Sequence, residues 1–110
     1  MHFMTTVKDI HRHEANDDHD KSLGVLFNPQ SVAIIGASDD TSRIGGRSVL
    51  YLKNYGFLGS IYPVNRSRAH VQGLQAYSSV ELIPGEVSLA IVALPANAVL
   101  EAVRACARKG

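Results

Sequence analysis

A glycine-containing stretch after the first apolar run holds residues that could bind an anion. Gly36 ends that run, and Gly45 and Gly46 follow nine and ten positions later. Glycine lets a backbone approach a ligand closely, and the amides at the start of a helix attract negative charge. The stretch matches neither G-x-G-x-x-G nor G-x-x-x-x-G-K-[ST], which disfavours the dinucleotide fingerprint and excludes the P-loop of kinases and ATPases. We therefore expect a phosphate contact of another kind, although glycines at a tight strand-to-helix connection are also often purely structural.

Basic residues are concentrated in the same part of the chain. No acidic residue lies between Asp40 and Glu81, and the bases in this interval are Arg43, Arg47, Lys53, Arg66 and Arg68. Arg66 and Arg68 follow a predicted strand at the position where NAD-binding proteins usually present a carboxylate to the ribose. Arginine there suits a ribose phosphate, such as that of NADP or the 3′-phosphate of coenzyme A. The alternative interpretation is a solvated loop that carries two exposed arginines. The net charge of the whole chain is only +1, which argues against a nucleic-acid partner or a polybasic membrane anchor.

Alternating strand and helix patterns supply the framework for these residues. We predict strands at Ser31–Gly36, Ser60–Asn65 and Ser88–Leu94, helices at Ile44–Tyr55 and from Ala96 to Gly110, a short extended piece at Gly73–Tyr77 and a helical turn at Ser79–Ile83. This order predicts a Rossmann-like α/β fold, an open parallel sheet with flanking helices, incomplete at its C-terminal side because the last helix ends at Gly110. Ligands of such sheets bind at the switch point, here between Ser31–Gly36 and Ser88–Leu94.

The first 22 residues differ in texture from the rest. They are polar and lack a sustained apolar period, so we expect a flexible tail at 1–22 and a single domain at 23–110. His11, His13 and His19 have no ordered scaffold in such a tail, and we assign no metal. The lone Cys106 excludes an internal disulfide framework and fits a cytoplasmic protein. No apolar run approaches the roughly 20 residues of a membrane span.

Five segments together carry a family resemblance. They read L-F-N-P-Q-S-V-A-I-I-G-A-S (26–38), R-I-G-G-R (43–47), G-F-L-G-S-I-Y-P-V-N (56–65), G-L-Q-A-Y (73–77) and L-A-I-V-A-L-P-A (89–96). In order and spacing they resemble the N-terminal CoA-binding domain of NDP-forming acyl-CoA synthetases. That family includes the ADP-forming acetate-CoA ligases, is related to the succinyl-CoA synthetase alpha chain, and lends the same module to protein acetyltransferases. The resemblance covers residues 26–110.

The resemblance implies a set of coenzyme A contacts. The residues implied at the phosphates are Gly36, Ala37, Ser38 and Gly45, with Arg43 and Ile44 at the same helix start. Those implied beside the adenosine are Val64 and Asn65. The other side of the cofactor is bordered by Leu94, Pro95 and Ala96. Where family members often continue V-N with Pro-Lys, this chain has Arg66-Ser67. The partner of the 3′-phosphate is therefore left open between Arg66 and Arg68.

These observations favour a coenzyme A binding module whose ligands are CoA or acyl-CoA. The alternatives are an NADP-binding oxidoreductase half-domain and a stand-alone nucleotide-sensing module. In the ligases the phosphorylated histidine and the nucleotide-binding grasp domain come later in the chain, and His70 sits in a loop outside that later domain. We therefore expect no catalysis from this chain alone, with downstream ligase domains as its missing partners.

The strand Ser88–Leu94 leads to one more expectation. It is apolar on both faces, and its outer neighbour would normally come after Gly110. Without that neighbour the strand is an edge with no charged residue to protect it. We expect the isolated chain to be marginally stable and to self-associate through this edge, or to fold well only when the remaining βα units are supplied.

Overall fold

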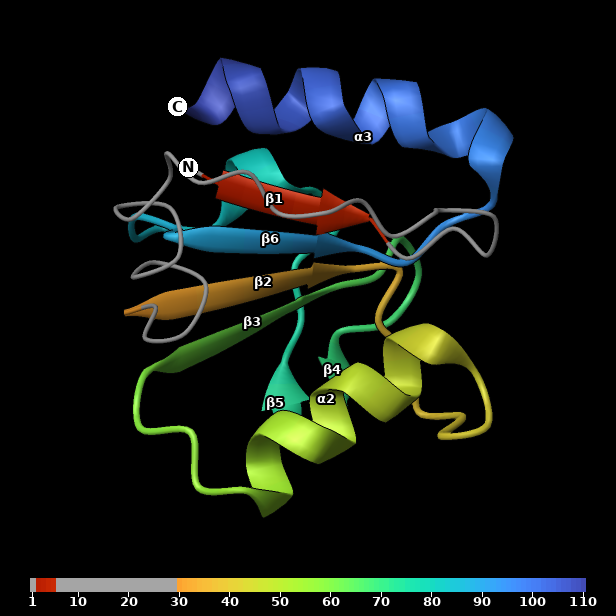
Figure 1. The fold of residues 1–110 in the computed structure, drawn as a ribbon, viewed down its shortest axis with the longest axis vertical. Helices are drawn as coiled ribbons and strands as arrows, with labels where there is room; N and C mark the ends of the chain where they lie inside the picture. The colour runs from red at the N-terminus through yellow and green to blue at the C-terminus, as the bar shows by residue number, and fades with distance from the viewer. Residues whose placement is uncertain (1, 6–29) are drawn as a thin grey trace, which may run out of the picture.

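The computed structural model describes residues 2–5 and 30–110 of the chain. Its centre is a four-stranded parallel sheet in the order β1-β6-β2-β3, with strands β1 (His2–Thr5), β6 (Leu89–Val92), β2 (Ser31–Ile35) and β3 (Ser60–Val64). All four strands run in the same direction, so their carboxyl ends meet at one edge (Figure 1). The three strands predicted from the sequence are confirmed as β2, β3 and β6.

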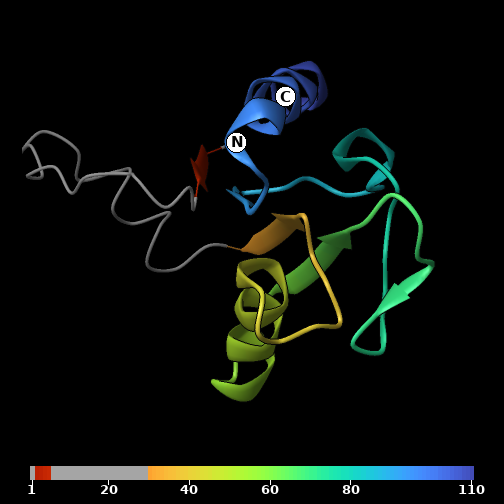
Figure 2. The same cartoon turned by 90° about the vertical axis from the view of Figure 1, so that its right-hand side faces the viewer.

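Two helices cover opposite faces of this sheet (Figure 2). Helix α2 (Ile44–Asn54) connects β2 to β3, and helix α3 (Ala96–Lys109) follows β6. Val49 of α2 packs with one set of strand residues, whereas Ala102 and Cys106 of α3 pack with the other set. This arrangement confirms the predicted Rossmann-like α/β fold.

Alternation along β2 creates the two cores. Val32 and Ile34 face α2, Ala33 and Ile35 face α3, and all four side chains are buried. A strand that is covered on both faces must be apolar at every position, and this explains the continuous S-V-A-I-I run. Strand β3 lies at the edge of the sheet, where Pro63 removes a ladder amide at little cost.

A small hairpin and a 3₁₀ turn lie between β3 and β6. The hairpin consists of β4 (His70–Val71) and β5 (Leu74–Gln75), and the turn η1 spans Val80–Leu82. The turn agrees with the predicted helical segment Ser79–Ile83, and β5 lies within the predicted extended piece Gly73–Tyr77. Strand β4 was not predicted. Among the described residues no helix is long and apolar enough to cross a membrane.

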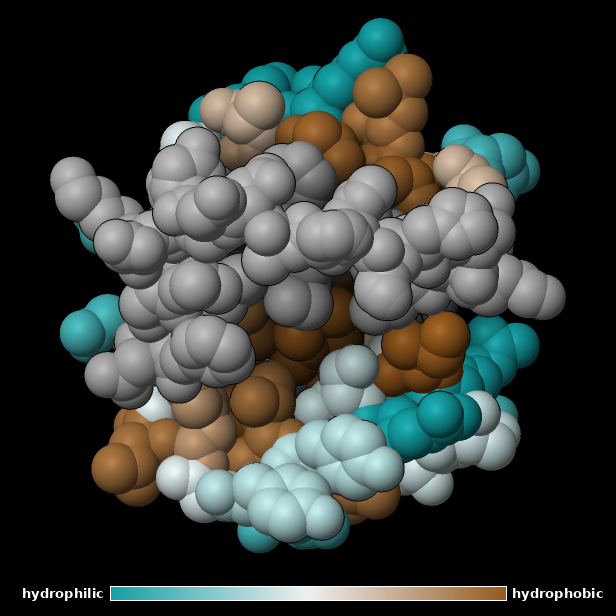
Figure 3. All heavy atoms as spheres, viewed as in Figure 1, coloured by the Kyte–Doolittle hydropathy of each residue, from teal (hydrophilic) through white to brown (hydrophobic). Residues whose placement is uncertain are grey.

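Helix α2 ends at Asn54, one residue before its predicted end. Gly56 adopts a φ of +75°, and the amide of Phe57 donates to the carbonyl of Leu52 at 3.2 Å. This six-to-one bond is the Schellman motif, which needs a residue that tolerates positive φ. The outward side of the helix carries Tyr51 and Tyr55, whose rings are in edge contact with centroids 5.7 Å apart. In the space-filling view, hydrophilic side chains gather over the place where α2 lies (Figure 3).

Two expectations about the ends of the chain need correction. The outer edge of β6 is occupied, because His2–Thr5 pair with Leu89–Val92 in parallel register. The predicted open edge at Ser88–Leu94 is therefore wrong, and with it the structural basis for self-association there. Residues 2–5, predicted to belong to a flexible tail, form β1 instead. The rest of that segment, 6–22 with His11, His13 and His19, lies outside the described residues.

Candidate ligand-binding cleft

The candidate site is a cleft at the switch point of the sheet. From β2 the chain proceeds to β3 on one side and later returns to β6 on the other side, so the loops after β2 and β6 diverge. Between them lies a cavity of about 820 Å³, a size typical of small-molecule sites. Its lining combines the loops after β2, β3 and β6 with one side of α3 and η1. This is the place that the strand order predicts for a ligand.

Residues 36–46, the loop after β2 together with the first residues of α2, form one wall, and their glycines shape it. Gly36 has a φ of +93°, and a Cβ there would lie 2.2 Å from the Ala93 carbonyl oxygen of the loop after β6. A Cβ on Gly45 would lie 1.9 Å from the Gly36 carbonyl oxygen, and one on Gly46 would lie 2.1 Å from that of Asp40. Only glycine therefore lets the loop pack directly on the first turn of α2.

The first turn of α2 is suited to face an anion. Its leading amides, from Ile44 to Gly46, have no acceptor within the helix. No acidic residue occupies this turn, and the N-cap Arg43 supplies no side-chain cap. The helix dipole adds positive potential at the same place.

Asp40 folds the middle of the loop into a tight turn. Its carboxylate accepts hydrogen bonds from the Ser42 hydroxyl at 2.6 Å and the Ser42 amide at 3.0 Å. These two bonds, with a smaller contribution from the charge of Arg43, hold the pKa of Asp40 below its usual range. Arg43 Nε lies 3.8 Å from the same carboxylate and is largely exposed.

Asn65, at the end of β3, braces the loop from the other side. Its Nδ2 donates to the Ala37 carbonyl at 2.9 Å, and its Oδ1 accepts the amides of Ser67 and Arg68. The amides of Gly36 and Ala37 in turn share the Val64 carbonyl. Asn65 thus fixes the loops after β2 and β3 relative to each other.

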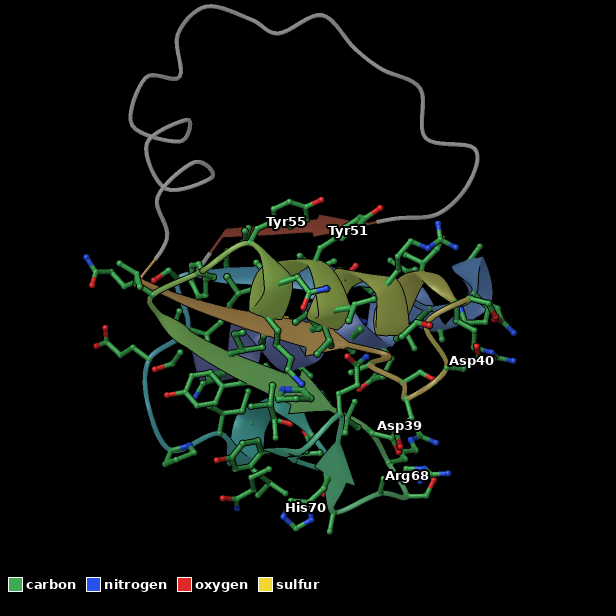
Figure 4. The ribbon with its side chains drawn as sticks, turned by 90° about the horizontal axis from the view of Figure 1, so that it is seen from below. Asp39, Asp40, Tyr51, Tyr55, Arg68 and His70 are labelled. Atoms are coloured by element: carbon green, nitrogen blue, oxygen red, sulfur yellow. The ribbon has the colours of Figure 1, made fainter. Side chains whose placement is uncertain are left out.

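The positive charge of the region is distributed less evenly than the sequence predicts. Asp39 and Asp40 lie just before the acid-free interval, and in the fold they approach its arginines. Arg68 Nη1 lies 3.1 Å from Asp39 Oδ2, and Figure 4 shows the two side chains together beside the hairpin. Arg66 lines the cleft and makes no hydrogen bond or ion pair with the described residues. Of the two arginines proposed for a ribose phosphate, Arg66 is therefore the one available.

The opposite wall is formed by α3 and η1. Ala98, Ala102 and Ala105 present small side chains to the cavity. At the end of this wall, Arg108 Nε lies 2.9 Å from Glu81 Oε2, and its Nη2 lies 3.2 Å from Glu101 Oε2. Hydrogen bonds to Glu81 and then to Glu101 raise the pKa of Arg108. These charges neutralise one another in part, so Arg108 differs from Arg66, which has no ion-pair partner in the part of the chain that the structure describes.

The structure brings most of the predicted site residues together. Those lining the cleft are Gly36, Ala37, Ser38, Arg43, Val64, Asn65, Arg66, Leu94 and Pro95. Ile44, Gly45, Arg68 and Ala96 do not line it. Gly45 is buried behind the loop against Gly36, and Arg68 is turned to Asp39. No group of three or more His, Cys, Asp or Glu side chains gathers in the part of the chain described.

Two parts of the site were missed from the sequence. One is the wall formed by Ser78–Glu81 and α3, since η1 was predicted only as a connecting turn. The other is Gln72, whose side chain donates to the loop at Ser38 and Gly46. Gly73 is the sequence signal that could have revealed this hairpin, because the second position of a two-residue turn needs a residue that tolerates positive φ.

Comparison with known proteins identifies the family. The family model described as "CoA binding domain" matches residues 30–110. The chain belongs to this family. It is 44% identical over 88 residues to the "Acetate--CoA ligase [ADP-forming] II subunit alpha" of Pyrococcus furiosus, covering 80% of this chain and 19% of that protein. It is also 47% identical over 85 residues to "Acetate--CoA ligase [ADP-forming] II" of Archaeoglobus fulgidus, covering 77% and 13%.

Solved structures agree with this membership. The "dinucleotide forming Acetyl-coenzyme A synthetase 1" of Ca. Korarchaeum cryptofilum, in complex with phosphate and ADP, superposes with a TM-score of 0.76 at 37% identity. The match covers 79% of this chain and 19% of that one. The chain therefore spans about a fifth or less of the relatives named here. It is a CoA-binding domain resembling the N-terminal domain of ADP-forming acetate-CoA ligases, and an NADP-binding oxidoreductase is not favoured.

Proposed function

We propose that this chain binds coenzyme A, free or acylated, in the cleft between the loops after β2 and β6. The observation that carries the proposal is the cleft itself, a cavity of about 820 Å³ at the switch point. It is bounded by a glycine-shaped loop and by Arg66, which has no ion-pair partner among residues 2–5 and 30–110. Coenzyme A carries a diphosphate and a 3′-phosphate, and each needs a separate positive group. The loop and Arg66 provide two such groups.

The diphosphate is assigned to the loop 36–46. The positive end of the α2 dipole favours a phosphate beside the cleft-lining residues 36–38, and the first turn of α2 carries no competing carboxylate. The 3′-phosphate is assigned to Arg66, because Arg68 already pairs with Asp39. Arg43, exposed at the N-cap of α2, adds positive charge near the diphosphate.

Calorimetry with coenzyme A and dephospho-CoA tests the proposal. Removal of a charge-assisted contact by Arg66→Ala should weaken CoA binding by about 1–3 kcal/mol. Dephospho-CoA should bind the unaltered protein about as weakly as CoA binds the Arg66→Ala variant. Arg68→Ala is the matched control and should retain the preference for CoA. Absence of heat and of a thermal shift with CoA, in a chain shown to be folded, would refute the proposal.

In a longer protein this domain would deliver CoA to an acid-CoA ligase reaction. The ligase relatives are several times longer than the matched region, so the partners proposed for this chain are the remaining ligase domains, supplied in the same or another polypeptide.

Cys106 is buried and unpaired among the described residues, which agrees with a reducing, cytoplasmic setting. Tighter binding of NADPH than of CoA in direct competition would overturn the assignment of CoA as the ligand.

A further inference from the structure

The turn of the β4–β5 hairpin contains an unusual residue. Gln72 and Gly73 form a two-residue turn with φ values of +50° and +82°. A turn with two positive φ values favours Asn, Asp or Gly at its first position, because longer side chains are strained there. Among the described residues, Gln72 is the one non-glycine with positive φ. A strained position that persists calls for a reason in its contacts.

Those contacts connect the hairpin to both ends of the cleft loop. Gln72 Nε2 donates to the Ser38 carbonyl at 3.0 Å and to the Gly46 carbonyl at 2.9 Å. The first acceptor lies just after β2, and the second lies in the first turn of α2. One side-chain amide thus uses both of its hydrogens to join the beginning and the end of the loop.

The backbone of the same residue is also held. Its amide donates to Asp39 Oδ1 at 2.6 Å, and its carbonyl accepts Lys53 Nζ at 2.6 Å. Asp39 is held a second time by Arg68. The hairpin is therefore anchored to α2 and to the loop, and Gln72 is not among the residues that line the cleft.

We propose that Gln72 is a positioning residue that keeps the loop 36–46 in its ligand-binding shape. The inference rests on the proposed binding of coenzyme A in this cleft. If only a fraction of the molecules hold the loop in its binding shape without Gln72, the measured affinity is the intrinsic affinity multiplied by that fraction, although no ligand contact is lost. Shorter turn residues would relieve the strain but would not reach both carbonyls. The reach of Gln explains why a residue disfavoured in this turn occupies it.

The test uses two variants that separate shape from stability. Gln72→Gly removes both side-chain hydrogen bonds and relieves the positive φ, so its thermal midpoint should stay close to that of the unaltered protein. Gln72→Asn keeps an amide and tolerates the turn, but its side chain is one methylene too short. Both variants should bind CoA about 5- to 30-fold more weakly, as expected for one or two lost hydrogen bonds. The weakening should be equal for CoA and dephospho-CoA, in contrast to that of Arg66→Ala.

Hydrogen exchange without ligand provides an independent readout. The amides of Asp40, Ser42 and Arg43 are hydrogen-bonded within the loop. In Gln72→Gly these amides should exchange faster, whereas those of β2 and β6 should be unchanged. Unchanged exchange in the loop, or wild-type CoA affinity in both variants, would overturn the inference. Failure of the unaltered protein to bind CoA would overturn the proposed function instead, and loop exchange would still decide the role of Gln72.

Discussion

Substitution of Gly45 by alanine tests whether the first turn of α2 is pressed against the loop after β2. In an exposed helix this change would stabilise the protein by about 1 kcal/mol, because alanine is the better helix former. Here the added Cβ would lie 1.9 Å from the Gly36 carbonyl oxygen and 2.8 Å from its carbon. To reach even the shortest spacing that real Cβ atoms show, helix or loop must move by about 1 Å.

The clashing atoms belong to the backbone of Gly36, so no side-chain rotation can relieve the contact. The Gly36 amide is tied to the Val64 carbonyl at 3.1 Å, so displacement of the loop strains the end of the sheet. Overpacking costs about 1–3 kcal/mol, and a forced backbone movement of about 1 Å belongs in the upper part of that range, about 2–3 kcal/mol, which exceeds the gain in helix propensity. We expect Gly45→Ala to lower the free energy of unfolding by about 1–2 kcal/mol, together with the affinity for CoA. Urea unfolding and calorimetry measure the two effects.

Gly56→Ala is the matched control. Gly56 has a φ of +75°, and a Cβ there meets nothing within 4 Å. Alanine in this conformation costs about 1–2 kcal/mol through strain alone. Gly56 lies at the other end of α2, so this variant should lose similar stability and keep its CoA affinity. A Gly45→Ala variant that is as stable as the unaltered protein, or more stable, would refute the reasoning.

Three further predictions follow from β1, Asp40 and Cys106. Deletion of residues 1–5 should uncover the edge of β6 and produce concentration-dependent association in sedimentation velocity; a monomer at high concentration would contradict the role of β1. The carboxyl of Asp40 should titrate by NMR with a pKa below that of an ordinary aspartate. Its hydrogen bonds with Ser42 are then fully present above the ordinary pKa and are lost only as pH falls through the lowered pKa; an ordinary pKa would show that the turn does not form in solution. Burial raises the pKa of the Cys106 thiol, so iodoacetamide should alkylate the folded protein at pH 8 more slowly than the protein in urea, and equal rates would contradict its burial.

The central strands could be predicted because their burial on both faces produces a local apolar pattern in the sequence. Ser31–Ile35 and Leu89–Val92 are covered on both faces, and each appears in the sequence as a continuous apolar run. Strand β1 has no such signal, because four residues at the start of a polar segment gain their structure only by pairing with β6. A pairing between opposite ends of a chain depends on tertiary contacts that local patterns do not record. For the same reason the predicted open edge of β6 was wrong.

The position of the cleft could be predicted, but several residue roles could not. The strand order alone places a ligand between the loops after β2 and β6, and the cavity lies there. The arginines after β3 looked equivalent in the sequence. In the fold Asp39 is held beside Arg68 by the hairpin, and Arg66 is left facing the cleft. Charge spacing along a chain therefore did not show which cation is neutralised.

Most groups that shape the cleft loop differ from the arginine proposed to recognise a phosphate, although Asn65 both braces the loop and lines the cleft. Asn65 and Gln72 hold carbonyl oxygens of the loop, and Asp40 folds its middle. Arg66 makes no hydrogen bond or ion pair within the described part of this framework, so under the proposed function its charge would select among phosphates. A change in the framework should scale the affinity for every CoA derivative by one factor, whereas a change at Arg66 should alter the ratio between them. Affinity and selectivity can then be adjusted independently, because preorganisation and charge recognition lie on different residues.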